Sequence, residues 1–307
     1  MLRYIGNRLL ASIPTVLLVT ILVFLMLHLI PGDPAEIFLG ENFSTPELLA
    51  KVRADMGLDR PLHEQYLSYL GGALRGDFGR SLNNNRPVLD EIAARLPPTI
   101  ELTVAALTIG VVLGVGLGVV SALCHNTWVD TLAMALALLG VSMPIFWMSL
   151  LLIFLFSVRL NWFPALSTDG LQGLVLPALA LGLLSSSTLA RMVRSSMLEV
   201  LGQDYMRTAR AKGLRERTVV LRHALKNALI PTITVLGLQF GQLLGGAVIT
   251  ETIFARQGIG RLYVESILRK DFTMVQGLTL LIAVAYVLIN LAVDVAYAAV
   301  DPRIQYE

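Results

Sequence analysis

Apolar residues gather in six long runs along the chain, and polar stretches separate them. The runs cover residues 9–30, 100–123, 132–157, 173–193, 231–250 and 276–299. A helix needs about twenty consecutive apolar residues to cross the hydrocarbon core of a bilayer. The pattern therefore predicts an all-α integral membrane protein with six transmembrane helices.

The first run also has features of a secretory signal, because Arg3 and Arg8 precede it. However, it is longer than the apolar core of a typical signal peptide, and the PGDPAEI that follows offers no small-residue cleavage site. We interpret residues 1–30 as the N-terminus and an uncleaved first span.

The positions of Lys and Arg next to the spans predict the orientation in the membrane. Arg3 and Arg8 precede the first span with no acid, and residues 191–226 hold nine Lys or Arg against three acids. Short cytoplasmic loops carry such an excess of positive charge. We therefore expect a multi-pass membrane protein with both termini and residues 194–230, called the basic insert below, in the cytoplasm.

Residues 31–99 are then an extracytoplasmic segment, and their pattern predicts helices. Ser44 or Thr45 can cap a helix that has Pro46 in its first turn and stops at Gly57. PLHEQYLSYLGGAL and PVLDEIAARL predict two more short helices. The segment can pack as a lid on the outer membrane face or contact an extracytoplasmic partner, and the two roles are compatible.

Composition agrees with a membrane protein and limits the chemistry. Hydrophobic residues make up 55% of the chain, charged residues 15%, and the mean hydropathy is +0.69. The net charge of +2 gives no reason to expect nucleic acid as a partner. Cys124 is the single cysteine and the four histidines are scattered, so we expect no disulfide within the chain, no metal site and no cofactor bound by this chain.

Glycines recur every fourth residue in two of the runs, which places them on one helix face and lets another helix approach closely. The candidates for helix packing in the second and fifth runs are Gly110, Gly114, Gly118, Gly237, Gly241 and Gly245.

Polar residues inside the runs are candidates for a translocation path, because polar side chains at membrane depth tend to face a bundle interior or a wet cavity. Interhelix hydrogen bonds are the simpler alternative. The polar candidates are Gln239, Gln242 and Asn290, and Met143, beside the break at Pro144, is a fourth, apolar candidate. Pro144 and Pro177 interrupt the third and fourth runs, where we expect kinks.

The basic insert contains the unusual stretch DYMRTARAKGLRERTVVLRHALKNALIP. Asp204 can cap a short helix that Gly213 ends, and a second helix is expected from about Glu216 to Leu229. Such a basic element can lie on anionic lipid or fit a groove of a cytoplasmic protein. The groove alternative also accounts for the small residues of the first helix, Thr208, Ala209 and Ala211.

TARAKGL…HALKNALIP resembles the cytoplasmic "EAA" loop of binding-protein-dependent ABC importer permeases, in the dipeptide/oligopeptide/nickel/glutathione branch. The likeness extends over nearly the whole chain through LIPGDPA, GDFGRSL, GVSMPIFW and NLAVDVAYAAVDPRI. It is closest to the first, B-type, permease subunit. Arg207 stands where the general motif has its glutamate, the spacing from Gly213 to Pro231 is longer, and Gln257 replaces a common proline.

The resemblance implies the type I importer permease fold, with residues 100–307 as the permease core, and a location in the bacterial cytoplasmic (inner) membrane. It also implies that residues of the insert couple the chain to a cytoplasmic ATPase. By position in the motif these are Tyr205, Arg207, Thr208, Ala209, Arg210, Ala211, Lys212, Gly213 and Leu214.

The resemblance further implies the partners: a second permease subunit that is a different chain, two ATPase subunits or domains that bind ATP and Mg, and an extracytoplasmic solute-binding protein. The chain has no GxxxxGK[ST] phosphate loop, so ATP hydrolysis is expected on a separate subunit and this chain is not an enzyme. The solute stays open among di- or oligopeptides, glutathione and nickel chelates.

Three other classes of membrane protein predict different sequence features. An ion-coupled secondary transporter predicts inverted repeats and buried midspan acids, and the sequence has no clear example of either. A channel predicts filter residues without a docking helix. A membrane-embedded enzyme predicts motifs such as HExxH or GxSxG, which the sequence lacks.

Overall fold

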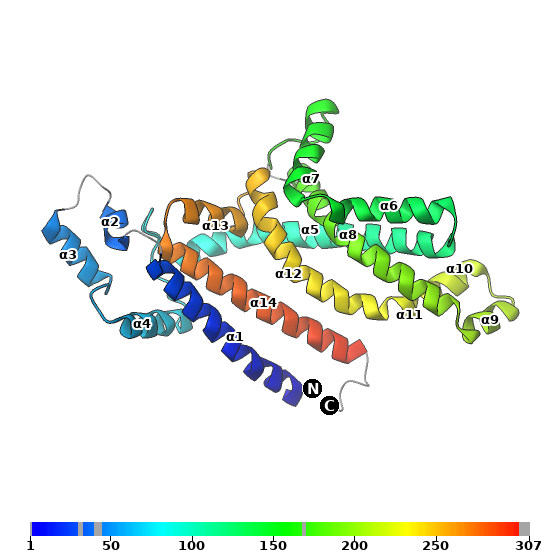
Figure 1. Ribbon diagram of the computed structural model, residues 1–307, viewed down its shortest axis with the longest axis horizontal. Helices are drawn as coiled ribbons and strands as arrows, with labels where there is room; N and C mark the ends of the chain where they lie inside the picture. Colours follow the sequence, from blue (N-terminus) through cyan, green and yellow to red (C-terminus); the bar gives the residue numbers. More distant parts are fainter. Residues whose placement is uncertain (1, 30–32, 40–44, 168–169, 301–307) are drawn as a thin grey trace. The chain divides into compact units, whose positions relative to one another are not determined.

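A computed structural model describes residues 2–29, 33–39, 45–167 and 170–300 (Figure 1). Within these residues the regular elements are helices, and the extended pairing is one isolated bridge between Arg80 and Pro87. The helices, of which η1 and η2 are π-helices, are α1 Leu2–Leu29, α2 Pro34–Leu39, α3 Pro46–Asp55, α4 Leu62–Leu74, α5 Val88–Leu123, α6 Trp128–Ser142, α7 Ile145–Leu152, η1 Ile153–Arg159, α8 Leu171–Leu201, α9 Asp204–Ala211, α10 Glu216–Thr218, η2 Val219–Ala224, α11 Leu225–Ala228, α12 Ile230–Ile253, α13 Ile259–Leu268 and α14 Phe272–Val300.

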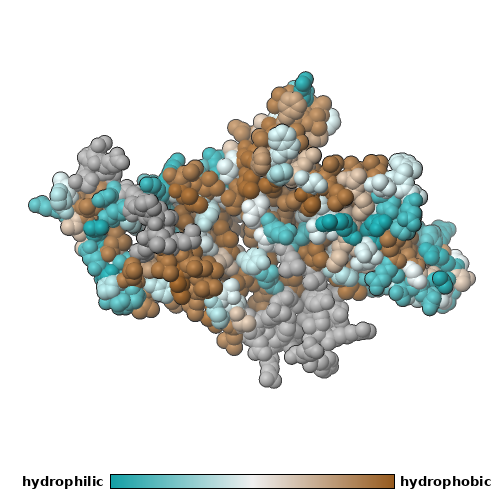
Figure 2. Space-filling model, viewed as in Figure 1, coloured by the Kyte–Doolittle hydropathy of each residue, from teal (hydrophilic) through white to brown (hydrophobic). Residues whose placement is uncertain are grey.

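Five of the six apolar runs lie, over their described residues, on one helix each, and the run 132–157 is divided between α6 and the helix formed by α7 and η1. Four described helices, α5, α8, α12 and α14, are long and apolar enough to cross a membrane. The pair formed by α6 with α7 and η1 makes a fifth if it is one span, and α1 holds a shorter apolar helix, Leu10–Leu25. Figure 2 shows the brown apolar surface of α6 and α7, and the paler and teal surface of the end that carries α9 and α10.

Two expectations about helix boundaries are wrong. PVLDEIAARL is not a separate short helix, because α5 runs without a break from Val88 through Pro97 and Pro98 to Leu123. Pro144 does more than kink a span: α6 ends at Ser142, and the axes of α6 and the following helix differ by 109°. A residue before proline is pushed out of the helical region, and Met143 accordingly has an extended backbone.

The chain divides into two compact units, Met1–Pro97 with Arg261–Leu291, and Pro98–Gly260 with Ala292–Glu307. In the first unit, α4 packs on α1 through Tyr66, whose hydroxyl lies 2.9 Å from Thr20 Oγ1 and whose ring meets Phe24 edge-on. Helix α3 begins as the sequence predicts, with Thr45 Oγ1 accepting from Leu48 N–H, and Gly57 follows it with φ +68°.

The buried carboxylate of Asp271 organises the loop before α5 in this first unit. It accepts hydrogen bonds from the Ser81 hydroxyl, the Leu82 N–H (3.1 Å) and the Asn83 side chain (3.2 Å), and from the N–H of Met274 (3.2 Å). The loop and the first turn of α14 are therefore joined by one acid.

Helix α8 is the centre of the second unit, and 67% of its most apolar window is buried. Helices α6 and α12 pack against it, and α5 approaches it through glycines. A Cβ on Gly114 would lie 2.6 Å from Leu189 Cβ, and one on Gly118 would lie 2.7 Å from Ala190 O. A Cβ on Gly110 would overlap the Ser185 hydroxyl. The backbones of α5 and α8 meet because these positions carry no side chain.

The glycines of α12 behave differently from one another. A Cβ on Gly237 would overlap Val293, whereas one on Gly245 would meet nothing within 4 Å in this chain. Gly241 is half-buried. The close approach to α8 is made instead by Gly246, where a Cβ would lie 2.7 Å from Leu181 Cδ2.

The close approach of α5 to α8 predicts different effects for two glycines of one helix. Gly114→Ala should lower the free energy of unfolding by about 1–3 kcal/mol, because the new methyl group overpacks the contact. Gly116→Ala is the matched control, since a Cβ there meets nothing within 4 Å and alanine favours the helix. Thermal unfolding of the purified protein in detergent, followed by tryptophan fluorescence, measures both. Equal melting temperatures for the two variants would contradict this packing.

Candidate functional site

The nine predicted coupling residues lie on α9 and on the turn that follows it. The expected cap is wrong by one residue: Gln203 is the N-cap, and Asp204 is the first residue of the helix, with no side-chain capping bond. Its carboxylate is nevertheless well placed, because negative charge is favourable in the first turn of a helix.

Helix α9 ends where the sequence predicts, next to Gly213. Gly213 has φ +76°, a conformation that L side chains rarely adopt, and its N–H donates to Arg210 O at 2.9 Å. A Cβ at Gly213 would meet nothing within 4 Å, so backbone conformation rather than space favours glycine at this position.

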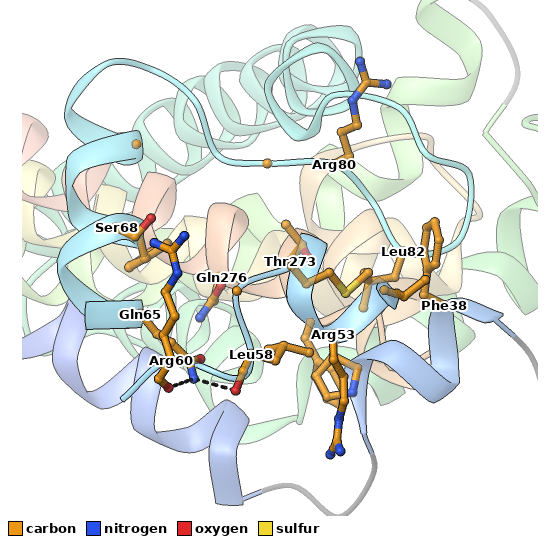
Figure 3. A pocket seen from close by; sticks show the side chains of 18 of the residues that line it. Phe38, Arg53, Leu58, Arg60, Gln65, Ser68, Arg80, Leu82, Thr273 and Gln276 are labelled. Carbon is orange, nitrogen blue, oxygen red and sulfur yellow. Dashed lines mark hydrogen bonds between the residues drawn. The ribbon is translucent and has the colours of Figure 1, made fainter. Parts of the chain in front are cut away.

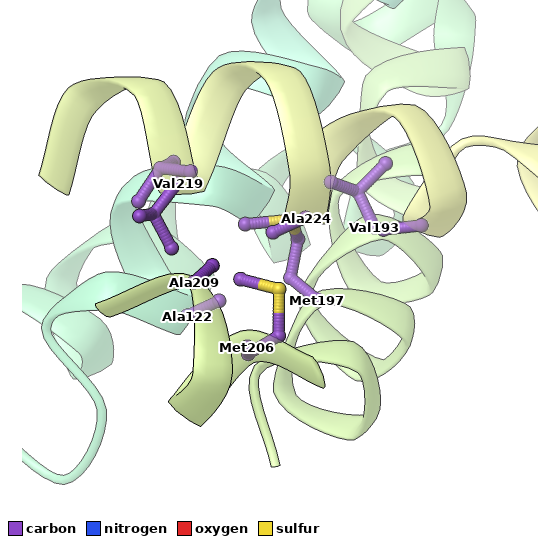
Figure 4. Packing of buried hydrophobic residues seen from close by; sticks show 9 residues of the cluster. Ala122, Val193, Met197, Met206, Ala209, Val219 and Ala224 are labelled. Atoms are coloured by element: carbon purple, nitrogen blue, oxygen red, sulfur yellow. The ribbon is translucent and has the colours of Figure 1, made fainter. Parts of the chain in front are cut away.

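One face of α9 is buried in the chain's own core. Met206 is fully buried and Ala209 is 9% exposed, in a cluster shared with α8, the end of α5, η2 and α11 (Figure 4). Figure 4 shows Met206 and Met197 meeting near Ala209 and Ala224. The residues of this inner cluster are Ala122, Val193, Met197, Met206, Ala209, Val219, Val220, Ala224 and Ala228.

This burial corrects part of the interpretation of the small residues. Ala209 packs within the chain's own inner cluster, so this contact accounts for its small side chain without a partner. Thr208 and Ala211 are exposed, so they are the small residues on the outer face of the helix.

The outer face of α9 and its turn presents basic and amphipathic side chains to the surroundings. Arg207 has 80% of its side chain exposed, and Lys212 is also exposed. Tyr205 and Leu214 are exposed to 42% and 41%, although the Tyr205 hydroxyl accepts a hydrogen bond from Asn227 at 2.9 Å.

Arg210 forms an ion pair with Glu216, on the other side of the turn that follows α9. Its guanidinium donates to Glu216 at 2.8 Å and 3.2 Å, and these hydrogen bonds lower the pKa of the Glu216 carboxyl and raise the pKa of Arg210. Arg210 thus differs from Arg207, because it is already paired across the hairpin.

The second predicted helix of the insert is helical throughout but contains a π-helical turn. Its pieces are α10, η2 and α11, and α12 starts immediately afterwards at Ile230 with Pro231 in its first turn. The inner cluster therefore leads directly into a 24-residue helix.

Sequence reasoning missed an ion pair at the base of the insert. Arg194 of α8 donates to both carboxylate oxygens of Asp130, at 2.9 Å and 2.8 Å, and Asp130 also accepts from Ser121 and from the N–H of Asn126. The Arg194 Nη2 atom lies 3.2 Å from His125 Nδ1. This pair joins α8 to the ends of α5 and α6.

The four candidates for a translocation path have different surroundings within their own units. Gln239 is 3% exposed and donates to the Ser185 carbonyl of α8 at 3.1 Å, so it packs between helices of its own chain. Gln242 is exposed, and Met143 is half-buried at the break between α6 and α7. Asn290 is half-buried and belongs to the first unit.

A cavity of about 1210 Å³ lies in the first unit, among α2, α3, α4 and the start of α14 (Figure 3). Its wall mixes apolar side chains such as Phe38 and Leu82 with Arg60, Arg80 and Gln65. Gln65 is fixed by hydrogen bonds to the carbonyls of Leu58 (3.1 Å) and Arg60 (2.8 Å), which Figure 3 shows as dashed lines.

Among the described residues, no group of three or more His, Cys, Asp or Glu side chains is placed to hold a metal ion.

Comparison with known proteins decides the family. Residues 114–306 match the binding-protein-dependent transport system inner membrane component, and residues 1–103 match the N-terminal part of such membrane components. The chain belongs to this family. It is a permease of the ABC importer type and a multi-pass protein of the inner membrane, and its activity is transport rather than catalysis, with the ATPase on a separate subunit.

The chain is similar over its full length to glutathione transport system permease proteins named GsiC. It is 47% identical over 307 residues to the protein from Salmonella typhimurium (strain LT2), with 100% of both chains covered. The identity to the Escherichia coli (strain K12) protein is 45% over the same length. These relatives agree with the dipeptide/glutathione branch of the importer permeases.

Solved structures agree on the fold. A chain of the inward-facing MetNI methionine ABC transporter aligns with a TM-score of 0.58 at 20% identity, covering 69% of this permease and 96% of that chain. A chain of an amino acid ABC transporter solved with histidines gives 0.50 at 18% identity, covering 70% and 94%. The permease therefore has the fold of ABC importer permeases, as its sequence predicts.

The two faces of α9 predict opposite outcomes for the same substitution. Ala209→Trp should unseat α9, because a tryptophan has no room in the inner cluster and overpacking costs about 1–3 kcal/mol. Ala211→Trp should leave the insert folded, since its side chain points outward. Limited trypsin digestion reads the difference, with rapid cleavage in the insert of Ala209→Trp and wild-type resistance in Ala211→Trp. Equal resistance of the two variants to trypsin would show that packing of Ala209 in the inner cluster does not hold α9 in place.

Proposed function

We propose that this permease imports glutathione and forms half of the pathway together with a second permease chain. Two ATPase subunits or domains in the cytoplasm bind ATP and Mg, and an extracytoplasmic binding protein delivers the solute. The choice of glutathione as the solute is supported by the 45–47% identity, over the full length, to permeases named for glutathione transport. Glutathione is itself a short peptide, so the proposal narrows the peptide expectation from the sequence.

The coupling to the ATPase is assigned to the outer face of α9 and its turn, residues 204–214. Two observations support this assignment. Met206 and Ala209 pack the helix against α8, η2 and α11, and α11 contacts α12, so a displacement of α9 acts on α8 directly and on α12 through α11. Its other face is exposed, basic and partly apolar, which suits a helix that enters a groove of another protein.

The proposed orientation places this helix, both termini and the Asp130–Arg194 pair on the cytoplasmic side. The excess of Lys and Arg in residues 191–226 supports that orientation. The segment 31–99, with its cavity, is then extracytoplasmic and lies on the side from which the binding protein delivers solute.

Uptake into proteoliposomes tests this function. The permease is reconstituted with its partner permease, the ATPase subunits and the binding protein, and radiolabelled glutathione is added outside the vesicles with ATP inside. Uptake should require ATP and every component. A nonhydrolysable ATP analogue should abolish it, because the energy comes from hydrolysis rather than an ion gradient.

Two outcomes would contradict different parts of the proposal. Uptake that persists without ATP, and follows an imposed proton or sodium gradient, would favour a secondary transporter. ATP-driven uptake of dipeptides or a nickel chelate, without uptake of glutathione, would keep the importer and replace its solute.

A further inference from the structure

A buried carboxylate fastens the end of α12 that lies away from the basic insert. Glu251, in the last turn of α12, is fully buried. One of its oxygens accepts from the Thr99 hydroxyl of α5 at 2.6 Å, and the other accepts from the Gly260 N–H at 2.7 Å, in the first turn of α13. Thr99 Oγ1 in turn accepts from the Ile259 N–H at 2.8 Å. One acid thus joins α5, α12 and the start of α13.

The backbone that connects α12 to α13 passes very close to this carboxylate. A Cβ on Gly258 would overlap the Glu251 carboxylate, and one on Gly260 would lie 2.5 Å from Val248 Cα. Ala255 has φ +51°, which is a strained conformation for an L residue. The absence of a side chain at Gly258 and Gly260 lets the backbone come this close to the acid and to α12.

Arg256 adds a second bond from this turn to α5. It is 8% exposed and donates to the Pro98 carbonyl at 3.1 Å and to Glu101 at 2.8 Å. The turn is therefore held to the same helix, α5, by two neighbouring sets of hydrogen bonds.

A buried carboxylate is costly unless its oxygens accept hydrogen bonds, and removing one partner leaves the other buried and unsatisfied. Loss of the Thr99 hydroxyl would therefore weaken the attachment of α12 to α5 without changing the shape of the side chain much, since valine has nearly the same volume.

The position of this cluster on α12 allows it to take part in transmitting a displacement along the helix. Helix α12 has 24 residues, and at 1.5 Å per residue it is about 36 Å long. One end adjoins α11, whose Ala228 belongs to the inner cluster that seats α9, and the other end carries Glu251 (Figure 1). The two ends of a single helix are thus attached to two different sets of neighbours.

We propose that Glu251 and Thr99 form a latch that makes the far ends of α5 and α12 move as one body when α9 is displaced. This inference rests on the proposed coupling through α9. The latch makes Glu251 a positioning residue: it touches no solute in this proposal, and acts by carrying the movement of α12 to α5.

The test compares Thr99→Val, which removes the hydroxyl, with Thr99→Ser, which keeps it. Spin labels are placed at Ile100 and Thr252, both exposed, after Cys124→Ser. In the assembled transporter, Thr99→Val should broaden and lengthen the distance between the labels, and Thr99→Ser should keep the wild-type distribution. The same samples give the number of solute molecules imported per ATP hydrolysed, which should fall at least about fivefold in Thr99→Val alone.

Each alternative result has a distinct meaning. An unchanged label distance in Thr99→Val overturns the latch. So does an altered distance with normal uptake per ATP, or a loss of ATPase activity in proportion to uptake, since the cluster would then serve stability only. If wild type shows no ATP-driven uptake, the proposed function fails, and the label distances alone decide whether the far ends are held together.

Discussion

Met206 and Ala209 hold α9 against the body of the permease, and this contact defines which face of the helix remains exposed. Without it, the basic insert would be a loose hairpin whose charges could lie on lipid or in water. With it, the helix is fixed to α8, to the end of α5 and to the helices that lead into α12. A movement imposed on the exposed face can therefore reach helices that cross the membrane.

The rest of the second unit is built to keep such helices at short distances. Apolar side chains give no net drive for association inside lipid, so close backbone packing and buried hydrogen bonds must supply it. Gly114 and Gly118 bring α5 onto α8, and Gly246 brings α12 onto α8. Asp130 with Arg194 joins helix ends at one side, and Glu251 with Thr99 joins them at the far end of α12.

The sequence predicts the elements of this structure better than their contacts. Apolar length locates the membrane helices, and the glycine at position 213 locates the end of α9, because each depends on neighbouring residues only. Whether Ala209 points inward or outward depends on what packs beside α9. Thr99 lies 152 residues from Glu251 along the chain, and Arg194 lies 64 residues from Asp130, so no local sequence pattern predicts these two contacts.

Features that the sequence leaves open, or that the structure corrects, depend on tertiary contacts in the same way. A proline in an apolar run can be absorbed within a helix, as Pro177 is, or can end it, as Pro144 does with a 109° bend. A glutamine in a span can face a path or a neighbouring helix, and Gln239 bonds to the Ser185 carbonyl. In both cases, contacts with residues distant in sequence determine which of the locally permitted conformations forms.

The exposure of the outer face of α9 in the assembled transporter is the most direct measure of this account. Single cysteines at Arg207 and Ala211, in a Cys124→Ser background, are labelled with a maleimide in the presence and absence of the ATPase subunits, with a cysteine at Arg75 as the control. Both α9 positions should become protected when the ATPase binds, while Arg75→Cys labels equally in both samples. Unchanged labelling of both α9 positions in an intact complex would contradict the assignment of this helix as the coupling element.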